Sequence, residues 1–205
     1  MSTLEVKDLS FSYSKNSQPL FKGVNFSIDS SERVALCAPS GFGKSTLCKI
    51  LAGYLRPSAG KVLLDGKEFG ARNNKPNPVQ LVWQHPEQVM DPYLRISRSL
   101  QEAGNIDSEI LDALGIRKEW LNRFPHELSG GELQRCCLAR TLALNPKFII
   151  ADEISTMLDA VTQVQIWTFL LDYIQENNIG MLLVTHSDSL RMRLATRTID
   201  LADFS

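Results

Sequence analysis

The chain has 205 residues, of which 43% are hydrophobic and 22% are charged, and its 22 basic and 23 acidic residues give a formal net charge of -1. A disordered chain has fewer apolar residues and a larger net charge, so this composition predicts one folded domain. The near-neutral charge argues against a protein that binds nucleic acid through a generally basic surface.

Features that would place the chain in or across a membrane are missing from the sequence. No apolar run approaches the roughly 20 residues that a membrane-spanning helix needs. The first residues do not join a basic segment to an apolar one, so no secretory signal is expected. The cysteines, which lack metal-ligand spacing, are expected to be buried, reduced thiols. They are Cys37, Cys48, Cys136 and Cys137.

Apolar residues, alternating with polar ones or in short runs, predict strands in the first half of the chain. These strands are expected over residues 4–13, 24–28, 33–38, 62–64 and 79–83. A loop over 39–43 leads from the third strand into a helix expected over 44–52.

The second half of the chain is predicted to alternate between helices and buried strands. Residues 94–127 are more polar, follow a helical pattern and are expected to form an inserted helical lobe. Further helices are expected over 133–144 and 160–176, and strands over 148–151, 181–184 and 199–201. Apolar strands that alternate with helices imply a largely parallel sheet with both faces covered.

The segment around Lys44 has the pattern of a phosphate-binding loop, in which a strand, a glycine-containing loop and a helix follow one another. The backbone N–H groups of such a loop bind anions at the helix N-terminus, Lys44 is expected to contact the β- and γ-phosphates, and the Ser45 hydroxyl is expected to bind Mg²⁺. The alternative is a glycine-rich turn that binds nothing. The candidate nucleotide-binding residues are Ala38, Pro39, Ser40, Gly41, Phe42, Gly43, Lys44, Ser45 and Thr46.

Two further segments carry candidate chemistry. Asp152 and Glu153 follow a buried strand, where an aspartate can organise Mg²⁺ and a glutamate can polarise a water; acidic residues also occur there simply because they stabilise a helix start. Ser129 and two glycines open a second helix, which is either a second anion-binding site or an ordinary helix cap.

The order and spacing of these motifs resemble those of the ATP-binding subunits of ABC transporters, and the resemblance covers nearly the whole chain. The Lys44 loop is similar to the Walker A motif, and Asp152 with Glu153 is similar to Walker B and the catalytic glutamate. The remaining motif residues are Gln84 in the Q-loop, Leu128, Ser129, Gly130, Gly131 and Glu132 in the signature, Asp159 in the D-loop, the switch histidine His186, and Tyr13 at the adenine-stacking position.

This resemblance implies a fold and a set of ligands. The fold is an α/β P-loop NTPase with a largely parallel central sheet, an N-terminal antiparallel β subdomain and an inserted α-helical subdomain at 94–127, all within one ATPase domain over 1–205. ATP and Mg²⁺ are the implied cofactors. The implied catalytic residues are Glu153, His186 and Gln84, and the implied metal ligands are Ser45, Gln84 and Asp152.

The resemblance also implies partners. ATP is expected to lie between the Lys44 loop of one chain and the signature of a second ABC ATPase subunit, which is either identical or different. Permease subunits in the membrane and a solute-binding protein complete the expected assembly, with the chain in the cytoplasm on the inner face of the cell membrane and without nucleic acid.

Within the family, residues 125–127 before the signature and Gln134-Arg135 after it look most like the oligopeptide, dipeptide and nickel importers. An ATPase subunit that powers import of peptide, nickel or a similar small solute is therefore expected. An exporter subunit and a non-transport ABC ATPase of DNA repair or translation are the alternatives. Members of the importer group often carry a C-terminal extension, which is not expected here.

Two residues depart from the family pattern. Ala38 replaces the first glycine of the phosphate-binding loop, which is tolerable unless that position requires a positive φ or a very close approach of phosphate. Ile154 replaces the proline that usually follows the catalytic glutamate, so the two carboxylates are retained but their orientation is less constrained.

Overall fold

The computed structural model describes residues 1–14, 17–68 and 76–204, which divide into two units. The first unit contains Met1–Leu81, Lys147–Asp152 and Asn178–Ser205. The second contains Val82–Pro146 and Glu153–Asn177. The chain thus passes between the units several times, and the candidate carboxylates Asp152 and Glu153 belong to different units.

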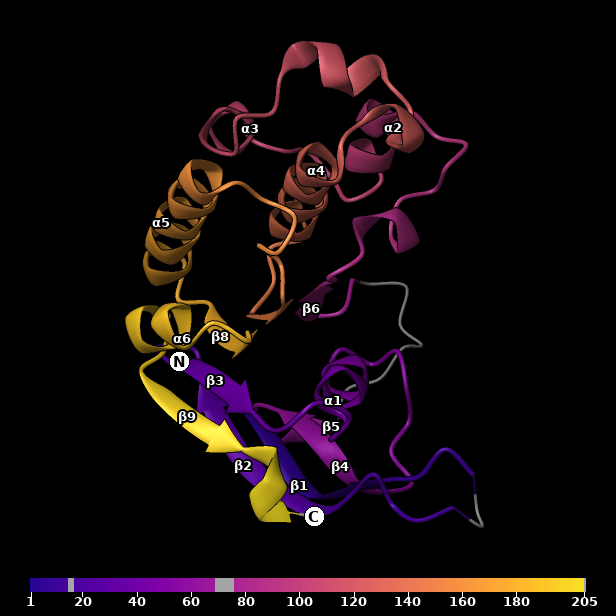
Figure 1. The fold of residues 1–205 in the computed structure, drawn as a ribbon, viewed down its shortest axis with the longest axis vertical. Coiled ribbons are helices and arrows are strands. Elements are labelled where there is room, and N and C mark those ends of the chain that lie inside the picture. Colours follow the sequence, from indigo (N-terminus) through magenta and orange to yellow (C-terminus); the bar gives the residue numbers. More distant parts are fainter. Residues whose placement is uncertain (15–16, 69–75, 205) are drawn as a thin grey trace. The chain divides into compact units, whose positions relative to one another are not determined.

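A four-stranded antiparallel sheet forms one layer of the first unit (Figure 1). Its strands, in spatial order, are β2 (Phe21–Asp29), β1 (Thr3–Phe11), β4 (Ala59–Leu64) and β5 (Lys67–Glu68). The pairing of β1 shifts in register between Val6 and Leu9, where Asp8 has a φ of 49°. A Cβ atom on Gly60 would lie 2.3 Å from the Asp8 carbonyl oxygen, so the irregular strand requires glycine opposite it. Tyr13, which was expected within a strand, lies beyond the end of β1.

The second sheet of this unit has five strands. In spatial order they are β6 (Val79–Val82), β7 (Phe148–Asp152), β8 (Gly180–Val184), β3 (Arg33–Cys37) and β9 (Arg197–Asp200). β8 pairs in parallel with both β7 and β3, and β3 pairs in parallel with β9. Every residue of β7 and β8 is buried, which explains why the sequence shows continuous apolar runs there. The predicted combination of an antiparallel and a parallel sheet is confirmed.

Helix α1 (Lys44–Leu51) follows β3 directly and contacts β7. The last elements along the chain are α6 (Asp188–Leu194), β9 and the 3₁₀ helix η4 (Leu201–Phe204). The strand expected over 199–201 therefore ends at Asp200. Helix α6 was not predicted, because it is short and its sequence is mostly polar.

The second unit is built from helices and turns. In chain order these are η1 (Pro86–Gln88), α2 (Ile96–Gln101), α3 (Ser108–Ala113), η2 (Lys118–Asn122), η3 (Pro125–Glu127), α4 (Gly130–Ala143) and α5 (Ala160–Glu176). Helix α4 contacts α2 and η1, and α2 contacts η2. Ile96, Leu100, Leu114 and Trp120 are buried in this unit. Among the described residues, no helix has both the length and the apolar character needed to cross a bilayer.

Candidate functional site

The loop between β3 and α1 has the backbone of an anion-binding turn. Gly41 and Gly43 have φ values of 85° and 88°, in the left-handed region that favours glycine. A Cβ atom on Gly43 would lie 2.6 Å from Leu20 Cδ2, so both conformation and space require glycine there. The Nζ of Lys44 donates to the carbonyl oxygens of Ala38 at 2.7 Å and Pro39 at 3.3 Å. The Lys44 side chain therefore lies across the loop between β3 and α1, which is the predicted phosphate-binding loop.

Alanine fits at position 38 because the backbone there does not need glycine. Among the described residues with positive φ, Ala38 does not occur. Its carbonyl oxygen accepts the shorter of the two Lys44 hydrogen bonds, an interaction that any residue can make. The departure from the family pattern therefore leaves the shape of this loop intact.

Oxygen ligands suited to Mg²⁺ lie on α1 and β7 of the first unit. Ser45 is exposed on the first turn of α1, and Asp152, only 7% exposed, ends β7. Burial raises the pKa of the Cys48 thiol on α1 well above its usual value, the charge of Asp152 raises it further, and the charge of Lys44 opposes the shift. Asp152 and Lys44 are thus both close enough to Cys48 for their charges to affect its pKa. A hydroxyl and a carboxylate are the oxygen donors that Mg²⁺ prefers, so these residues fit the metal.

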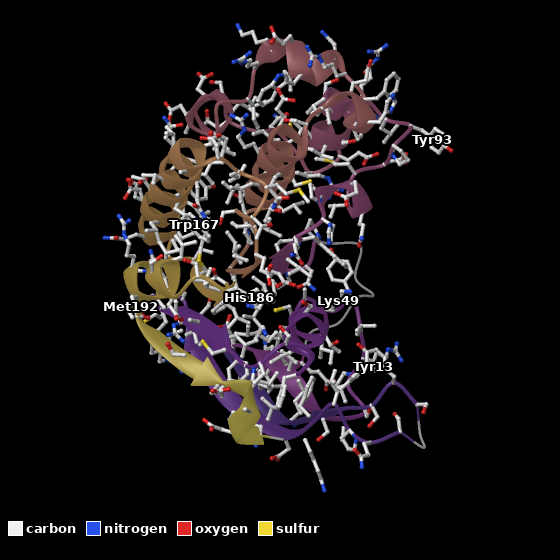
Figure 2. The ribbon with its side chains drawn as sticks, in the orientation of Figure 1. Tyr13, Lys49, Tyr93, Trp167, His186 and Met192 are labelled. Carbon is white, nitrogen blue, oxygen red and sulfur yellow. The ribbon has the colours of Figure 1, made fainter. Side chains whose placement is uncertain are left out.

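Tyr13 belongs to the same unit as the phosphate-binding loop (Figure 2). Its side chain is 73% exposed, and its hydroxyl makes a 2.9 Å hydrogen bond with Oγ1 of Thr46 on α1. Phe11 contacts the ring edge-on, with 5.1 Å between the centroids. The tyrosine is therefore fixed at its hydroxyl end while most of its surface faces solvent, as a stacking platform requires.

Three substitutions of Tyr13 distinguish a role in stacking on adenine from a role in packing within the protein. If the ring stacks on adenine, Tyr13→Trp and Tyr13→Phe should largely preserve ATP affinity, and Tyr13→Ala should weaken it by roughly 5- to 150-fold, the loss of about 1–3 kcal/mol of base stacking. Titration calorimetry with ATP measures the three affinities. Equal losses in all three variants would instead assign Tyr13 a packing role through Thr46.

In the second unit, Gln84 and Glu153 are joined by a direct hydrogen bond. The Nε2 of Gln84 donates to Oε2 of Glu153 at 2.8 Å, although 69 positions separate the residues. Glu153 has a φ of 51°, in the left-handed region that a non-glycine residue rarely adopts, and such strain often accompanies functional sites. Ile154, in place of proline, is buried. The hydrogen bond from the Gln84 amide and the burial of Ile154 both restrict the orientation of the Glu153 side chain.

The predicted signature forms the N-terminus of α4. Ser129 is the N-cap: the Glu132 N–H donates to Ser129 Oγ at 3.3 Å, and the Ser129 N–H donates to Glu132 Oε2 at 2.8 Å. This second hydrogen bond holds the pKa of the Glu132 carboxyl below its usual value. The helix expected over 133–144 extends over Gly130–Ala143, and it begins at the two glycines after Ser129, where the sequence also indicated a helix start. The signature is therefore the positive end of a 14-residue helix dipole.

The glycines of the signature contact the D-loop, residues 155–159. A Cβ atom on Gly130 would lie 2.9 Å from Met157 Sδ, and one on Gly131 would lie 3.2 Å from the Met157 carbonyl oxygen. At the end of the D-loop, Asp159 caps α5 and accepts from the Thr162 hydroxyl at 2.6 Å, which is the main reason that its pKa is lowered. The approach of the Met157 backbone thus gives a packing reason for Gly131, and at Gly130 the Met157 side chain would have to move to make room for a Cβ atom.

Two polar residues after the signature have positions that the sequence did not reveal. Gln134 is buried, and its Nε2 donates to the Trp83 carbonyl oxygen at 3.1 Å, beside Gln84. The Arg135 guanidinium lies 4.6 Å from the Trp120 ring centroid and donates to the carbonyl oxygen of Gly131. In the sequence, a glutamine within the expected helix is the only signal that could have indicated the hydrogen bond between Gln134 and the Trp83 carbonyl oxygen. These contacts connect the Q-loop, the helical lobe and the signature within the second unit.

His186 lies in the first unit, two residues beyond the end of β8. Its side chain is exposed, and Ser187 next to it caps α6 by accepting from the Leu190 N–H at 3.3 Å. Figure 2 labels its position. The first unit therefore carries Tyr13, the Lys44 loop, Asp152 and His186, and the second carries Gln84, Glu153, the signature and Asp159.

The parallel sheet, the glycine loop that opens α1, and the lysine that lies across that loop define a P-loop NTPase. The family model described as ABC transporter matches residues 21–156. The chain belongs to the ABC transporter family, in which it is an ATP-binding cassette with ATPase function.

Curated relatives span different cargoes. The chain is 32% identical to the putative hemin import ATP-binding protein HrtA of Staphylococcus saprophyticus, over 98% of this chain and 97% of that protein. It is 33% identical to the probable peptide ABC transporter ATP-binding protein y4tS of Sinorhizobium fredii, over 80% of this chain but only about half, 51%, of that protein. The similarity therefore supports an ABC cassette and does not single out the peptide and nickel group.

Solved cassettes share the fold. The dimeric post-hydrolysis structure of the ATP-binding cassette MJ0796 bound to ADP and Pi is 26% identical, with a TM-score of 0.82, and the match covers 96% of this chain and 93% of that one. The predicted fold class and ATP binding are confirmed at this level.

Proposed function

We propose that the chain is the ATP-hydrolysing subunit of an importer for peptide, nickel or a similar small solute, and that separate permease subunits carry the solute through the membrane. The observation that carries this proposal is the 2.8 Å hydrogen bond between Gln84 and Glu153. It joins the partly exposed first residue of the segment 84–92, which has exposed positions at His85, Glu87 and Gln88, to a carboxylate suited to activate water. Residues 125–127 and Gln134-Arg135, together with the similarity to y4tS, support a peptide-type cargo.

In this proposal, the first unit holds the nucleotide. Tyr13 stacks on adenine, and the backbone of residues 38–46 with Lys44 binds the β- and γ-phosphates. Ser45 and Asp152 of this unit would hold Mg²⁺, which would neutralise phosphate charge when bound, and Gln84 of the second unit is the third proposed ligand. His186 contacts the γ-phosphate and thereby helps position it.

The second unit supplies the remaining roles. Glu153 accepts a proton from the attacking water while the water oxygen bonds to the γ-phosphorus. The bond from that phosphorus to the bridging oxygen of the β-phosphate breaks, so that ADP leaves and inorganic phosphate forms. Gln84 orients the glutamate by donating to its Oε2. Leu128, Ser129, Gly130, Gly131 and Glu132 bind the nucleotide of a second cassette, and Asp159 sets the D-loop that lies against that signature. Under this proposal residues 1–205 act as one ATPase domain, 94–127 being its inserted lobe, on the inner face of the cell membrane with a solute-binding protein on the other side.

The surface over 84–92 is the proposed docking site for a permease helix. Single cysteines test it in a Cys37→Ser background, because the other native thiols are buried and burial raises the pKa values of Cys136 and Cys137 to about 12, which keeps them unreactive. Glu87→Cys, at an exposed position of η1, should crosslink to co-expressed permease subunits of a peptide importer.

The control is Lys61→Cys, at an exposed position of β4 in the antiparallel sheet. It should give no crosslink under the same conditions. Crosslinks from Lys61→Cys but not from Glu87→Cys would contradict the docking assignment, and so would the absence of any crosslink from Glu87→Cys.

A further inference from the structure

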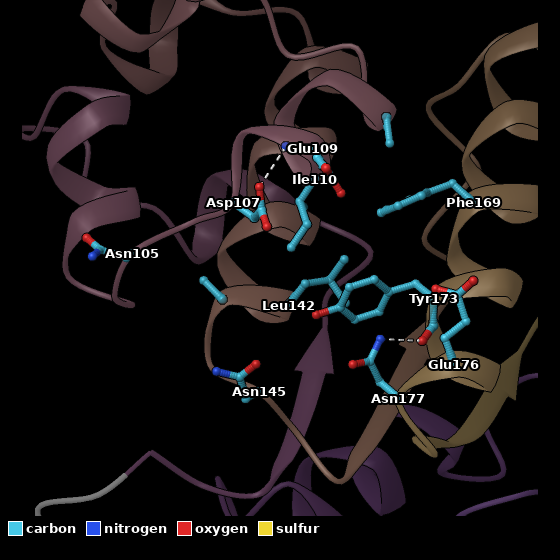
Figure 3. A pocket seen from close by; sticks show the side chains of 12 residues that line it. Asn105, Asp107, Glu109, Ile110, Leu142, Asn145, Phe169, Tyr173, Glu176 and Asn177 are labelled. Atoms are coloured by element: carbon cyan, nitrogen blue, oxygen red, sulfur yellow. Dashed lines mark hydrogen bonds between the residues drawn. The ribbon is translucent and has the colours of Figure 1, made fainter.

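The second unit contains a cavity that the proposed ATPase function does not use. It has a volume of about 500 Å³ and is bordered by α3, the end of α4 and the end of α5 (Figure 3). Its apolar part is formed by Ile110, Ala113, Leu142 and Ala143. None of the nucleotide-binding, signature or D-loop residues lines it, so it is a separate feature.

Aromatic rings form the α5 side of the cavity. Phe169 and Tyr173 lie one turn apart with 5.8 Å between their centroids and an interplanar angle of 46°. Figure 3 shows the Tyr173 ring beside Leu142, with Phe169 further along α5. Burial raises the pKa of Tyr173, and the charge of Asp107 raises it further, which places this carboxylate near the ring. Two aromatic side chains and a nearby carboxylate are suited to bind an organic cation.

The charge around the cavity is negative and uncompensated. Among the described residues, the cavity is lined by three carboxylates, Asp107, Glu109 and Glu176, and by no basic side chain. None of the three takes part in an ion pair within the part of the chain that the structure describes. As the N-cap of α3, the Asp107 carboxylate accepts from the Glu109 N–H at 3.0 Å.

The ends of two long helices add to this negative potential. Helix α4 has 14 residues and α5 has 17, and the final turns of both line the cavity. The C-terminal end of a helix carries a partial negative charge that favours cations. No basic residue lies in the last turn of α5, whereas the last turn of α4 carries Arg140, whose guanidinium donates to the Ser99 carbonyl oxygen. The negative end of α5 is therefore the one that no basic residue of its own last turn offsets. The partial negative charge at a helix end favours a bound cation independently of the three carboxylate side chains.

We propose that this cavity, which we call the α4–α5 cavity, binds a small organic amine whose ammonium group faces the carboxylates and whose apolar body lies against the aromatic rings. Asn105, Asn145 and Asn177 supply amide groups at its border for further polar contacts. An inorganic cation would leave the apolar surface and the rings unused, and an organic anion would face three like charges and the negative end of α5.

The test uses tryptamine, which carries an ammonium group on an indole ring, as the probe. Indole-3-propionate, which carries a carboxylate on the same ring, is the matched control. Isothermal titration calorimetry on the full chain without nucleotide should detect binding of tryptamine and none of indole-3-propionate. Each of Asp107→Asn and Glu176→Gln should weaken tryptamine binding about two- to fivefold, the range for exposed charge pairs. Asparagine is as good an N-cap as aspartate, so Asp107→Asn retains α3.

Three further variants distinguish binding at this site from a general effect of charge. Tyr173→Phe should retain binding and Tyr173→Leu should weaken it about two- to fivefold through loss of the ring face. Glu102→Gln, which removes an exposed carboxylate of the same unit outside the cavity, should leave the affinity unchanged. Equal affinity for both probes, no tryptamine binding, or the same affinity in all variants would overturn the proposal. ATP affinity measured on the same samples reports on the nucleotide site separately.

Discussion

Glu153→Gln is expected to lower the rate of ATP hydrolysis by at least about 100-fold, because a positioned general base contributes about 10²–10⁴-fold. The glutamine keeps the size of the side chain and its ability to contact Gln84, but it does not take a proton from water. ATP binding should survive, since Lys44, Ser45 and Asp152 are untouched. With hydrolysis blocked and one negative charge removed, the ATP-bound dimer should persist.

An ATPase assay and size-exclusion chromatography with light scattering, with and without ATP, measure both effects. Asp152→Asn should differ by losing Mg²⁺-dependent binding, and Glu102→Gln should behave as the unchanged chain. Near-normal turnover in Glu153→Gln would remove its catalytic assignment. Lost turnover without an ATP-dependent dimer would retain the assignment and favour a heterodimer with another cassette.

Lys44→Ala is expected to weaken Mg-ATP binding by about 10- to 100-fold, which corresponds to the loss of one charge-assisted hydrogen bond of about 1.5–3 kcal/mol. Lys44 donates to the carbonyl oxygens of Ala38 and Pro39, so the substitution also removes a contact across the loop. Titration calorimetry measures the affinity.

Lys61→Ala is the matched control, because this exposed lysine lies on β4 rather than on the loop. It should leave ATP affinity unchanged, and circular dichroism should show that both variants are folded. Unchanged affinity in Lys44→Ala would contradict the assignment of the phosphate-binding loop.

The sequence predicted those features that depend on local pattern. The apolar runs at β7 and β8 are strands because parallel strands are buried on both faces, and the glycines before Lys44 mark a turn with positive φ. The irregular pairing of β1 was not predicted, and neither was the close approach of Gly60 on β4 to the Asp8 carbonyl oxygen, because it joins two strands that are distant in the sequence.

Features that depend on distant contacts were not predictable in this way. Gln84 and Glu153 were each selected as candidates, but nothing local shows that their side chains meet. The packing of Gly130 against Met157 and the positive φ of Glu153 likewise arise only after the chain has folded. The α4–α5 cavity combines residues of three segments, each of which has an ordinary polar surface pattern by itself.

The hydrogen bond between Tyr13 and Thr46 bears on which nucleoside triphosphate this cassette accepts. In the role proposed for it, Tyr13 offers a nucleobase its ring face, because its hydroxyl is already engaged with α1. Every base has a π-face, so stacking alone is tolerant of base identity. A preference for ATP over GTP would then have to come from groups other than this tyrosine, because its hydroxyl is not available to read the purine edge.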